Sequence, residues 1–405
     1  MKCKFNPFTP TQIASDELFT GRDDELAQVD YCLQQTIHGN AIGFFLTGER
    51  GIGKSSLLLK VRSKAQFVHG VKSRIMLTVL ITLDEKDTVQ SFAQKITSEM
   101  HREKRRLRPI RQSIYDKFSW IYRVDTKWLK IIPPFTSNDD SWVTVDTLTD
   151  QIKFTLSRFK KSHAGFLLLI DEVERASEDL KLGALLKRLV EQFRKTGLNR
   201  ATIGLAGQLA AIDKLRGEHA AAIRSLRLIK LERLRSDESR LALNKGLALA
   251  SLRTGEKICI DDGAANWIVN TSDGYPHFLQ QLAASALETD TDGKISLDDA
   301  FNGAFGANGA IDQLGYSYFE GMFTVECTTD IERYVLNTLA KDPDTFLNVV
   351  EIADYLNEKQ EEVSCALSRL IVVGIVERHD VQLETYKVVS RAFATWIQIR
   401  RSQSK

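Results

Sequence analysis

The amino-terminal part of the chain contains the stretch Gly48-Glu49-Arg50-Gly51-Ile52-Gly53-Lys54-Ser55, followed by Ser56. It satisfies the pattern GxxxxGK[ST], between an apolar run at 42–46 and a helical pattern that begins at Ser55. Glycines let such a backbone turn tightly, so its N–H groups and the start of the helix point at bound phosphates. We therefore predict that residues 48–56 bind a nucleotide, with Lys54 on the β- and γ-phosphates and Ser55 as a ligand of Mg²⁺.

A second apolar run, at 166–170, ends in two acids, Asp171 and Glu172. At a strand tip beside a phosphate loop, Asp171 would hold Mg²⁺ and Glu172 would polarise the attacking water. Without the phosphate loop, an ordinary strand that ends in solvated acids would explain the pattern equally well. A further strand at 201–206 leads to Gln208, which could sense the γ-phosphate or could be a solvated loop residue.

Short apolar runs alternate with helical patterns through the first part of the chain, which predicts an α/β fold with a parallel sheet covered on both faces. The predicted strands are 42–46, 75–83, 166–170, 201–206 and 226–231. The predicted helices include 23–36, 55–65, 91–105, 147–162 and 180–194.

The strand signals stop near residue 234, and four helical patterns follow before a Gly/Asn-rich stretch at 302–309 that is expected to loosen the chain. Three further helices and a short hairpin from residue 328 onward predict a winged helix. We therefore expect an ATPase core at 1–234 with an extended lead-in, an all-α lid at 235–320 and a winged-helix domain at 325–405.

Composition limits the function classes. The chain has 405 residues and a formal charge of +2, so any nucleic-acid binding must rest on a local patch rather than on bulk charge. The mean hydropathy is −0.20 and no apolar run is long enough to cross a bilayer, so no membrane partner is expected. Five scattered cysteines without a CxxC pair, and no apolar segment at the start, predict a protein of the reducing cytoplasm.

Several motifs occur in an order that resembles the AAA+ and STAND ATPases of the origin-recognition (initiator-like) branch. Leu18-Phe19-Thr20-Gly21-Arg22-Asp23-Asp24-Glu25-Leu26 looks like their GR box, and Asn6-Pro7-Phe8-Thr9-Pro10 looks like the lead-in of bacterial members. Asp273-Gly274-Tyr275-Pro276 resembles the GxP motif that opens a lid helix. The phosphate loop alone is shared by many families, whereas this ordered set is far more specific and covers nearly the whole chain.

The resemblance implies an ATPase that uses ATP and Mg²⁺, with a helical lid and a C-terminal winged helix. It implies that Phe19, Gly21 and Arg22 touch the base or ribose, and that Gly274 and Pro276 close on the nucleotide. It also implies an arginine near the fifth strand that acts on nucleotide, for which Arg216, Arg224 and Arg227 compete and Arg224 is preferred. His277 stands where many AAA+ proteins carry a lid arginine, so a γ-phosphate contact from the lid is not expected.

A segment between the second strand and the acids, at about 101–140, is unusually basic and aromatic. Between 101 and 130 it holds ten arginines and lysines interleaved with Tyr115, Phe118, Trp120, Tyr122 and Trp128. Such a pattern suits nucleic acid, because cations pair with phosphates and aromatic rings stack on bases. A solvated basic helix followed by an aromatic protein-binding patch is the alternative.

The third helix of the predicted winged helix carries Glu361 and Glu362, which would repel duplex phosphates. Its charge favours docking to protein or to another copy of the chain.

Three functions remain open. The first is an ATP-driven molecular switch whose lid and winged helix change the partner bound. The second is a DNA-acting ATPase of the initiator or loader type, and the third is a module that holds nucleotide and hardly turns it over.

Overall fold

The computed structural model describes residues 5–13, 17–65, 75–106, 141–158, 163–379, 381–382 and 384–403. Contacts within the chain divide it into two compact units. The sheet unit comprises Arg22–Arg50 and Lys54–Leu231, and the helical unit comprises Met1–Gly21, Gly51–Gly53 and Glu232–Lys405. Most of the predicted basic-aromatic insert, from residue 107 to residue 140, lies outside the described residues.

The sheet unit is built on five parallel strands in the order β2-β3-β4-β1-β5. The strands are β1 Gly43–Thr47, β2 Ile75–Thr82, β3 His163–Asp171, β4 Ala201–Gly207 and β5 Leu226–Lys230. All five predicted strands are thus confirmed, and the predicted fold class is correct. The described strand order places β1, β3 and β4 side by side, so the segments that follow them meet at one edge of the sheet.

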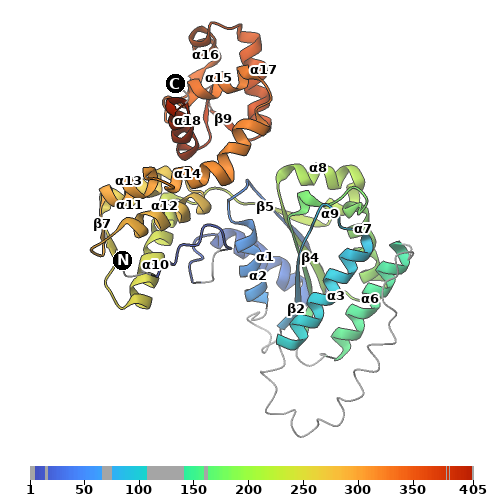
Figure 1. The fold of residues 1–405 in the computed structure, drawn as a ribbon. Coiled ribbons are helices and arrows are strands. Elements are labelled where there is room, and N and C mark those ends of the chain that lie inside the picture. Colours follow the sequence, from blue (N-terminus) through green and yellow to red (C-terminus); the bar gives the residue numbers. More distant parts are fainter. Residues whose placement is uncertain are drawn as a thin grey trace. The chain divides into compact units, whose positions relative to one another are not determined.

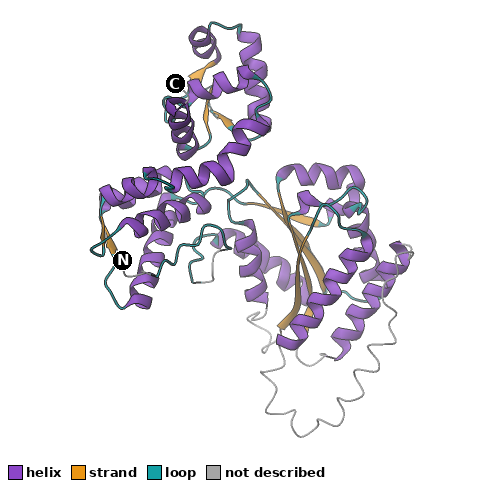
Figure 2. Ribbon diagram, in the orientation of Figure 1, coloured by secondary structure: helices purple, strands orange, loops and turns teal. Residues whose placement is uncertain are grey.

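Helices cover both faces of this sheet (Figures 1 and 2). One face carries α1 Asp23–Ile37 and α2 Lys54–Ala65. The other carries α3 Val89–Arg106, α6 Ser141–Arg158, α7 Leu182–Lys195, α8 Leu209–Glu218 and α9 Ala220–Arg224. A 3-10 turn, η3 Val173–Arg175, follows β3 directly.

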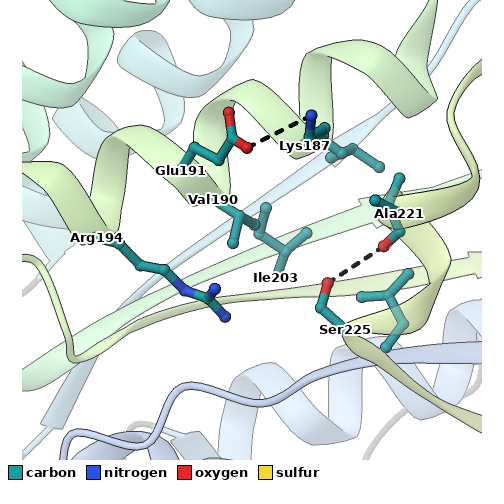
Figure 3. Close-up of a pocket in the computed structure, with 10 residues that line it drawn as sticks. Lys187, Val190, Glu191, Arg194, Ile203, Ala221 and Ser225 are labelled. Carbon is teal, nitrogen blue, oxygen red and sulfur yellow. Dashed lines mark hydrogen bonds and ion pairs between the residues drawn. The ribbon is translucent and has the colours of Figure 1, made fainter.

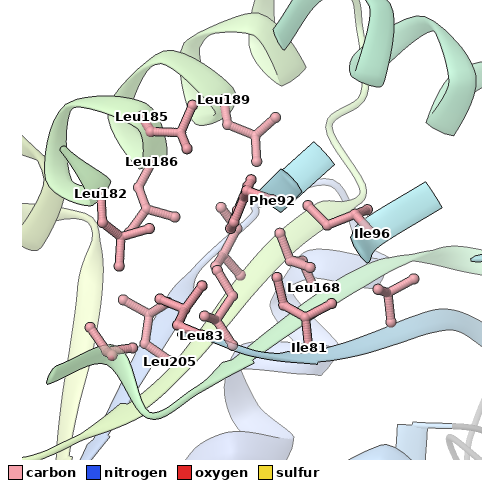
Figure 4. Packing of buried hydrophobic residues seen from close by; sticks show 14 of the residues in the cluster. Ile81, Leu83, Phe92, Ile96, Leu168, Leu182, Leu185, Leu186, Leu189 and Leu205 are labelled. Carbon is pink, nitrogen blue, oxygen red and sulfur yellow. The ribbon is translucent and has the colours of Figure 1, made fainter. Parts of the chain in front are cut away.

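Buried aliphatic and aromatic side chains fill the space beneath α3, α6 and α7 (Figure 4). Leucines along one side of α7 face the strands, and Phe92 and Ile96 of α3 meet them. Burying each such side chain contributes about 1.5–3 kcal/mol, so this layer contributes much of the free energy that stabilises the sheet unit.

The helical unit begins after β5 with a group of short helices and a two-stranded parallel sheet. Its first elements are α10 Ser236–Thr254, β6 Cys259–Ile260, α11 Asp262–Thr271, α12 Pro276–Thr289, β7 Lys294–Ile295, α13 Leu297–Phe305 and α14 Ala310–Leu314. Two π-helical turns follow, Gly315–Phe319 and Met322–Glu326. The Gly/Asn-rich stretch is less loose than predicted, because α13 continues to Phe305 and Ser296 caps its amino terminus.

The last elements are helices and a small antiparallel sheet in the order β8-β10-β9. They are α15 Asp330–Leu339, β8 Leu347–Asn348, α16 Val349–Leu356, α17 Gln360–Val372, β9 Val376–Arg378, β10 Thr385–Val388 and α18 Arg391–Gln403. The three predicted helices and the hairpin are confirmed. Helix α18 was not predicted from the sequence.

The lead-in packs on helices far along the sequence. The side chain of Asn6 donates to the Ala284 carbonyl at 3.1 Å, and the Thr9 N–H donates to Gln280 Oε1 at 3.1 Å. Pro7 and Pro10 disfavour a helix here, so the segment is extended and lies along α12. The boundaries near residues 234 and 320–325 stay predictions.

In the part of the chain that the structure describes, no helix has both the length and the apolar character that a bilayer crossing requires.

Candidate functional site

The phosphate loop connects β1 to α2, as the sequence predicts. Gly51 and Gly53 adopt φ values of +78° and +99°, which side chains rarely tolerate, so glycine is needed at both turns. Helix α2 begins at Lys54, and the N–H groups in the first turn of a helix point toward an anion placed at its amino end. The Lys54 ammonium donates to the carbonyl oxygens of Gly48 and Glu49, each at 2.8 Å. The lysine is therefore folded back over its own loop.

The electrostatic surroundings of Lys54 are acidic. Burial lowers the pKa of the Lys54 ammonium, while the charges of Glu174, Asp171 and Glu49 act to raise it. An ammonium that is partly removed from water can form strong charge-assisted hydrogen bonds with a phosphate.

Asp171 ends β3 and is buried, with 8% of its surface exposed. Burial raises the pKa of its carboxyl, while hydrogen bonds from the Ser55 hydroxyl and the Glu172 backbone N–H oppose the rise. The structure therefore brings together the two predicted metal ligands, Ser55 and Asp171. Carboxylate and hydroxyl oxygens suit Mg²⁺, so the donor set fits the predicted ion.

Glu172 follows Asp171 in a left-handed conformation, with φ at +55°. Its carboxylate forms an ion pair of 3.3 Å with Arg175, and both side chains are partly exposed. Glu172 is thus at the predicted strand end, but its carboxylate is engaged by a neighbour from the same turn.

Gln208 lies at the tip of β4, immediately before α8, and is exposed. Its backbone N–H donates to Glu174 Oε2 at 3.2 Å. Glu174 is a site residue that was not predicted from the sequence. Its position two residues after Glu172 is a weak signal, since acids are common in surface turns, and only the fold brings it to the β4 tip.

Arg224 is exposed at the last position of α9.

The other loop residues divide between buried and exposed. Ile52 is buried, Ser56 is half-buried on α2, and Glu49 and Arg50 are exposed. These positions are compatible with a loop whose backbone, rather than its side chains, faces the phosphates.

The predicted base-contacting segment lies partly in the helical unit. The Phe19 carbonyl accepts a hydrogen bond from Lys245 of α10 at 3.2 Å, and Gly21 lies beside Glu238 of the same helix. Arg22 precedes α1, is buried, and pairs with Glu25 at 3.1 Å.

The GxP turn also lies in the helical unit. At Gly274, φ is +73°, and a Cβ would lie 2.3 Å from the Leu234 carbonyl oxygen, so a larger residue cannot fit. The Gly274 carbonyl accepts the Leu234 N–H at 2.9 Å, and Pro276 opens α12.

The turn is connected to the last helix through Asp273. The Arg391 guanidinium pairs with the Asp273 carboxylate at 2.6 Å, and its other nitrogen pairs with Asp344 at 2.7 Å. Burial raises the pKa of Asp273, while the hydrogen bond and charge of Arg391 oppose the rise. Arg233, which precedes α10, forms a further ion pair with Glu377 of β9 at 3.1 Å.

A cavity of about 130 Å³ lies elsewhere in the sheet unit, between α7, α9 and the strands β4 and β5 (Figure 3). It is lined mainly by apolar side chains such as Val190, Ile203 and Leu226, with the Lys187–Glu191 ion pair of 3.5 Å at its margin. The phosphate loop follows the carboxyl end of β1, whereas the lining includes the first residue of β5. The cavity is therefore not the phosphate site.

Comparisons with known proteins agree with this geometry. A family model described as "AAA ATPase domain" matches residues 18–203. The Walker-type ATPase of Pyrococcus abyssi has a similar fold, with a TM-score of 0.57 and 15% identity over 94% of this chain and 96% of that chain.

The ORC2 protein of Aeropyrum pernix, in its ADPNP-ADP complexes, gives a TM-score of 0.57 with 12% identity over 94% of each chain. Its ADP form gives 0.52 with 13% identity over 97% of each chain. At these low sequence identities, the similarities show a shared fold.

One curated relative is an uncharacterized HTH-type transcriptional regulator of Methanocaldococcus jannaschii. It is 37% identical over 59 residues, and the match spans only 14% of this chain and 14% of that protein's length.

Residues 18–203 therefore match an AAA ATPase domain, a family that binds nucleotide, and the chain has a fold similar to those of the Pyrococcus abyssi Walker-type ATPase and the Aeropyrum pernix ORC2 protein.

Proposed function

We propose that this protein is an ATP-dependent molecular switch with slow turnover. ATP lies with its phosphates on residues 48–56, where Lys54 leaves the Gly48 and Glu49 carbonyls and binds the β- and γ-phosphates. Ser55 and Asp171 hold Mg²⁺, which supplies positive charge against the phosphates. The contact between these two side chains supports the assignment, because it places two oxygen ligands together at the loop.

Hydrolysis needs a base and a phosphate sensor. Glu172 is the base that polarises the attacking water, once its carboxylate leaves Arg175. Gln208 senses the γ-phosphate from the β4 tip, and Arg224 acts on nucleotide, in this chain or in a neighbouring copy. Phe19, Gly21, Arg22, Gly274 and Pro276 contact the nucleotide away from the γ-phosphate.

One observation carries the switch: the Asp273–Arg391 pair joins the GxP turn to the first turn of α18. Arg233, which precedes α10, pairs with Glu377 of β9, and Arg400 of α18 pairs with Glu320, so further ion pairs join the C-terminal elements to earlier parts of the helical unit. A turn that responds to nucleotide would carry the C-terminal helices with it. We further propose that these helices form a winged-helix domain, and that it docks to protein.

Fluorescence energy transfer tests this function directly. One dye is placed on α7 and the other on α17, and transfer is compared without nucleotide, with ATP and Mg²⁺, and with ADP. The Glu172→Gln variant holds the ATP state. The switch requires the ATP and ADP states to differ, and requires Arg391→Ala to reduce that difference. Equal transfer in all three states would contradict it and would favour a structural nucleotide-bound module.

A second candidate is a DNA-acting ATPase of the initiator type. The basic-aromatic insert favours it, as do the likeness in fold to an origin-recognition protein and the short match to an HTH-type regulator. DNA affinity that falls steeply with salt would support this candidate, because each cation–phosphate contact releases a counterion.

A further inference from the structure

Glu174 connects two elements that border the phosphate site. It belongs to the 3-10 turn after β3, and its Oε2 accepts the Gln208 N–H of the β4 tip at 3.2 Å. Gln208 is the N-cap residue of α8, and its side chain does not cap that helix. Its backbone N–H is bound instead by the Glu174 carboxylate of the neighbouring turn. The carboxylate thus bridges the acid turn and the proposed phosphate sensor.

The space for this carboxylate exists because β4 ends in glycine. A Cβ at Gly207 would lie 2.8 Å from Glu174 Oε2 and 3.1 Å from Val173 Cβ. A larger residue at position 207 would therefore require the Glu174 carboxylate to shift. The absence of a side chain at Gly207 thus leaves room for the Glu174 carboxylate beside the strand tip.

The two acids of the turn have different surroundings. Glu172 pairs with Arg175 of its own turn, whereas the charge of Glu174 acts on both Lys54 and Asp171. Glu174 is therefore the acid of this turn whose charge acts on the phosphate-site residues Lys54 and Asp171.

We propose that Glu174 is a positioning residue for ATP hydrolysis, which acts by fixing the backbone of Gln208. With its N–H held, Gln208 can present its amide to the phosphate end of the nucleotide in one orientation. A misplaced strand tip would slow the chemical step while leaving most of the nucleotide contacts intact. The inference rests on the proposed placement of ATP at the phosphate loop.

Steady-state ATP turnover of three variants tests it. Glu174→Ala removes the acceptor and should lower kcat by about tenfold, with KM changed less than about threefold. Glu174→Gln keeps an oxygen at the same reach and should stay within about threefold of wild type. Glu174→Asp withdraws the oxygen by one methylene and should resemble alanine. Glu178→Ala, an exposed acid of the same loop, is the matched control.

A double-mutant cycle separates this role from a merely structural one. If Glu174 acts through Gln208, then Glu174→Ala should add less than about a twofold loss in a Gln208→Ala background. Effects that multiply would overturn the proposal, as would a Glu174→Gln variant as slow as alanine or an alanine variant as fast as wild type. If Glu174→Ala does not fold, the contrast between aspartate and glutamine decides the matter. A wild-type protein without turnover would contradict the proposed function, whereas an active wild type with indifferent Glu174 variants contradicts this inference alone.

Discussion

The phosphate loop and the GxP turn are both short glycine-containing segments, but different parts of the chain hold them in place. The phosphate loop follows a buried strand, and Lys54 bonds to carbonyls five and six residues earlier. The GxP turn is held by Arg391, which lies 118 residues beyond Asp273. A contact between residues close in sequence is kept when distant parts of the chain move. A contact between residues far apart in sequence couples the movement of one part to that of the other. The first arrangement suits a binding site, and the second suits the coupling of distant elements.

The largest expected effect is on the local site. Lys54→Ala should abolish ATP binding, with a loss of at least about a hundredfold, because charged hydrogen bonds to phosphate disappear while the loop backbone stays. Calorimetry measures this loss. Lys64 lies on the same helix as Lys54, and Lys64→Ala removes only a half-exposed ion pair with Asp30 of α1, so this control should bind ATP normally. Unchanged affinity in Lys54→Ala would move the phosphate site elsewhere.

The next effect separates binding from chemistry at the same site. Glu172→Gln should keep ATP and Mg²⁺ but lower turnover by about a hundredfold, because an amide cannot polarise water as a carboxylate does. A phosphate-release assay measures turnover beside Glu178→Gln as the control. Wild-type turnover in Glu172→Gln would show that the base is another residue.

The long-range contact is tested by Arg391→Ala. The change leaves Asp273 without its guanidinium partner and should destabilise the helical unit by about 2 kcal/mol, the range of a charged hydrogen bond. Hydrogen exchange should quicken in α12 and α18 and stay unchanged in α2. Arg401→Ala, an exposed arginine of the same helix, should have no such effect. Faster exchange in α2 as well would mean that the two regions are not held independently.

The smallest expected effect concerns the basic-aromatic insert at about 101–140, which is part of neither the phosphate loop nor the GxP turn. Charge reversal at Arg105, Arg106 and Arg108 should weaken macromolecular binding by about tenfold and leave ATP affinity intact, since lost cation–phosphate contacts act only on the partner. A titration of DNA, and then of co-purified proteins, measures it beside a Trp120→Ala/Trp128→Ala double mutant. If the partner is protein, the tryptophans should matter more. Equal binding by all forms would assign the contact to the C-terminal helices instead.

Sequence patterns located the sheet unit well because its signals are local. A buried parallel strand reads as an apolar run, and a phosphate loop needs glycines at fixed spacing. Ser55 and Asp171 could therefore be paired from residue type and context alone, although 116 residues separate them in the chain. Glu174 could not be found this way, because an acid in a polar turn carries no periodic signal.

The sequence by itself determined the α/β class, the strands, the nucleotide loop and the acids at the end of β3, since each follows from residue type and spacing. The tertiary structure alone decided that Glu174 meets the β4 tip, that Glu172 turns to Arg175, and that Arg391 of α18 reaches Asp273. The physical reason is that these contacts depend on which helix or strand end comes to lie beside which. The packing of helices and strands is determined by the burial of their apolar faces, and the polar residues at their ends come together as a consequence.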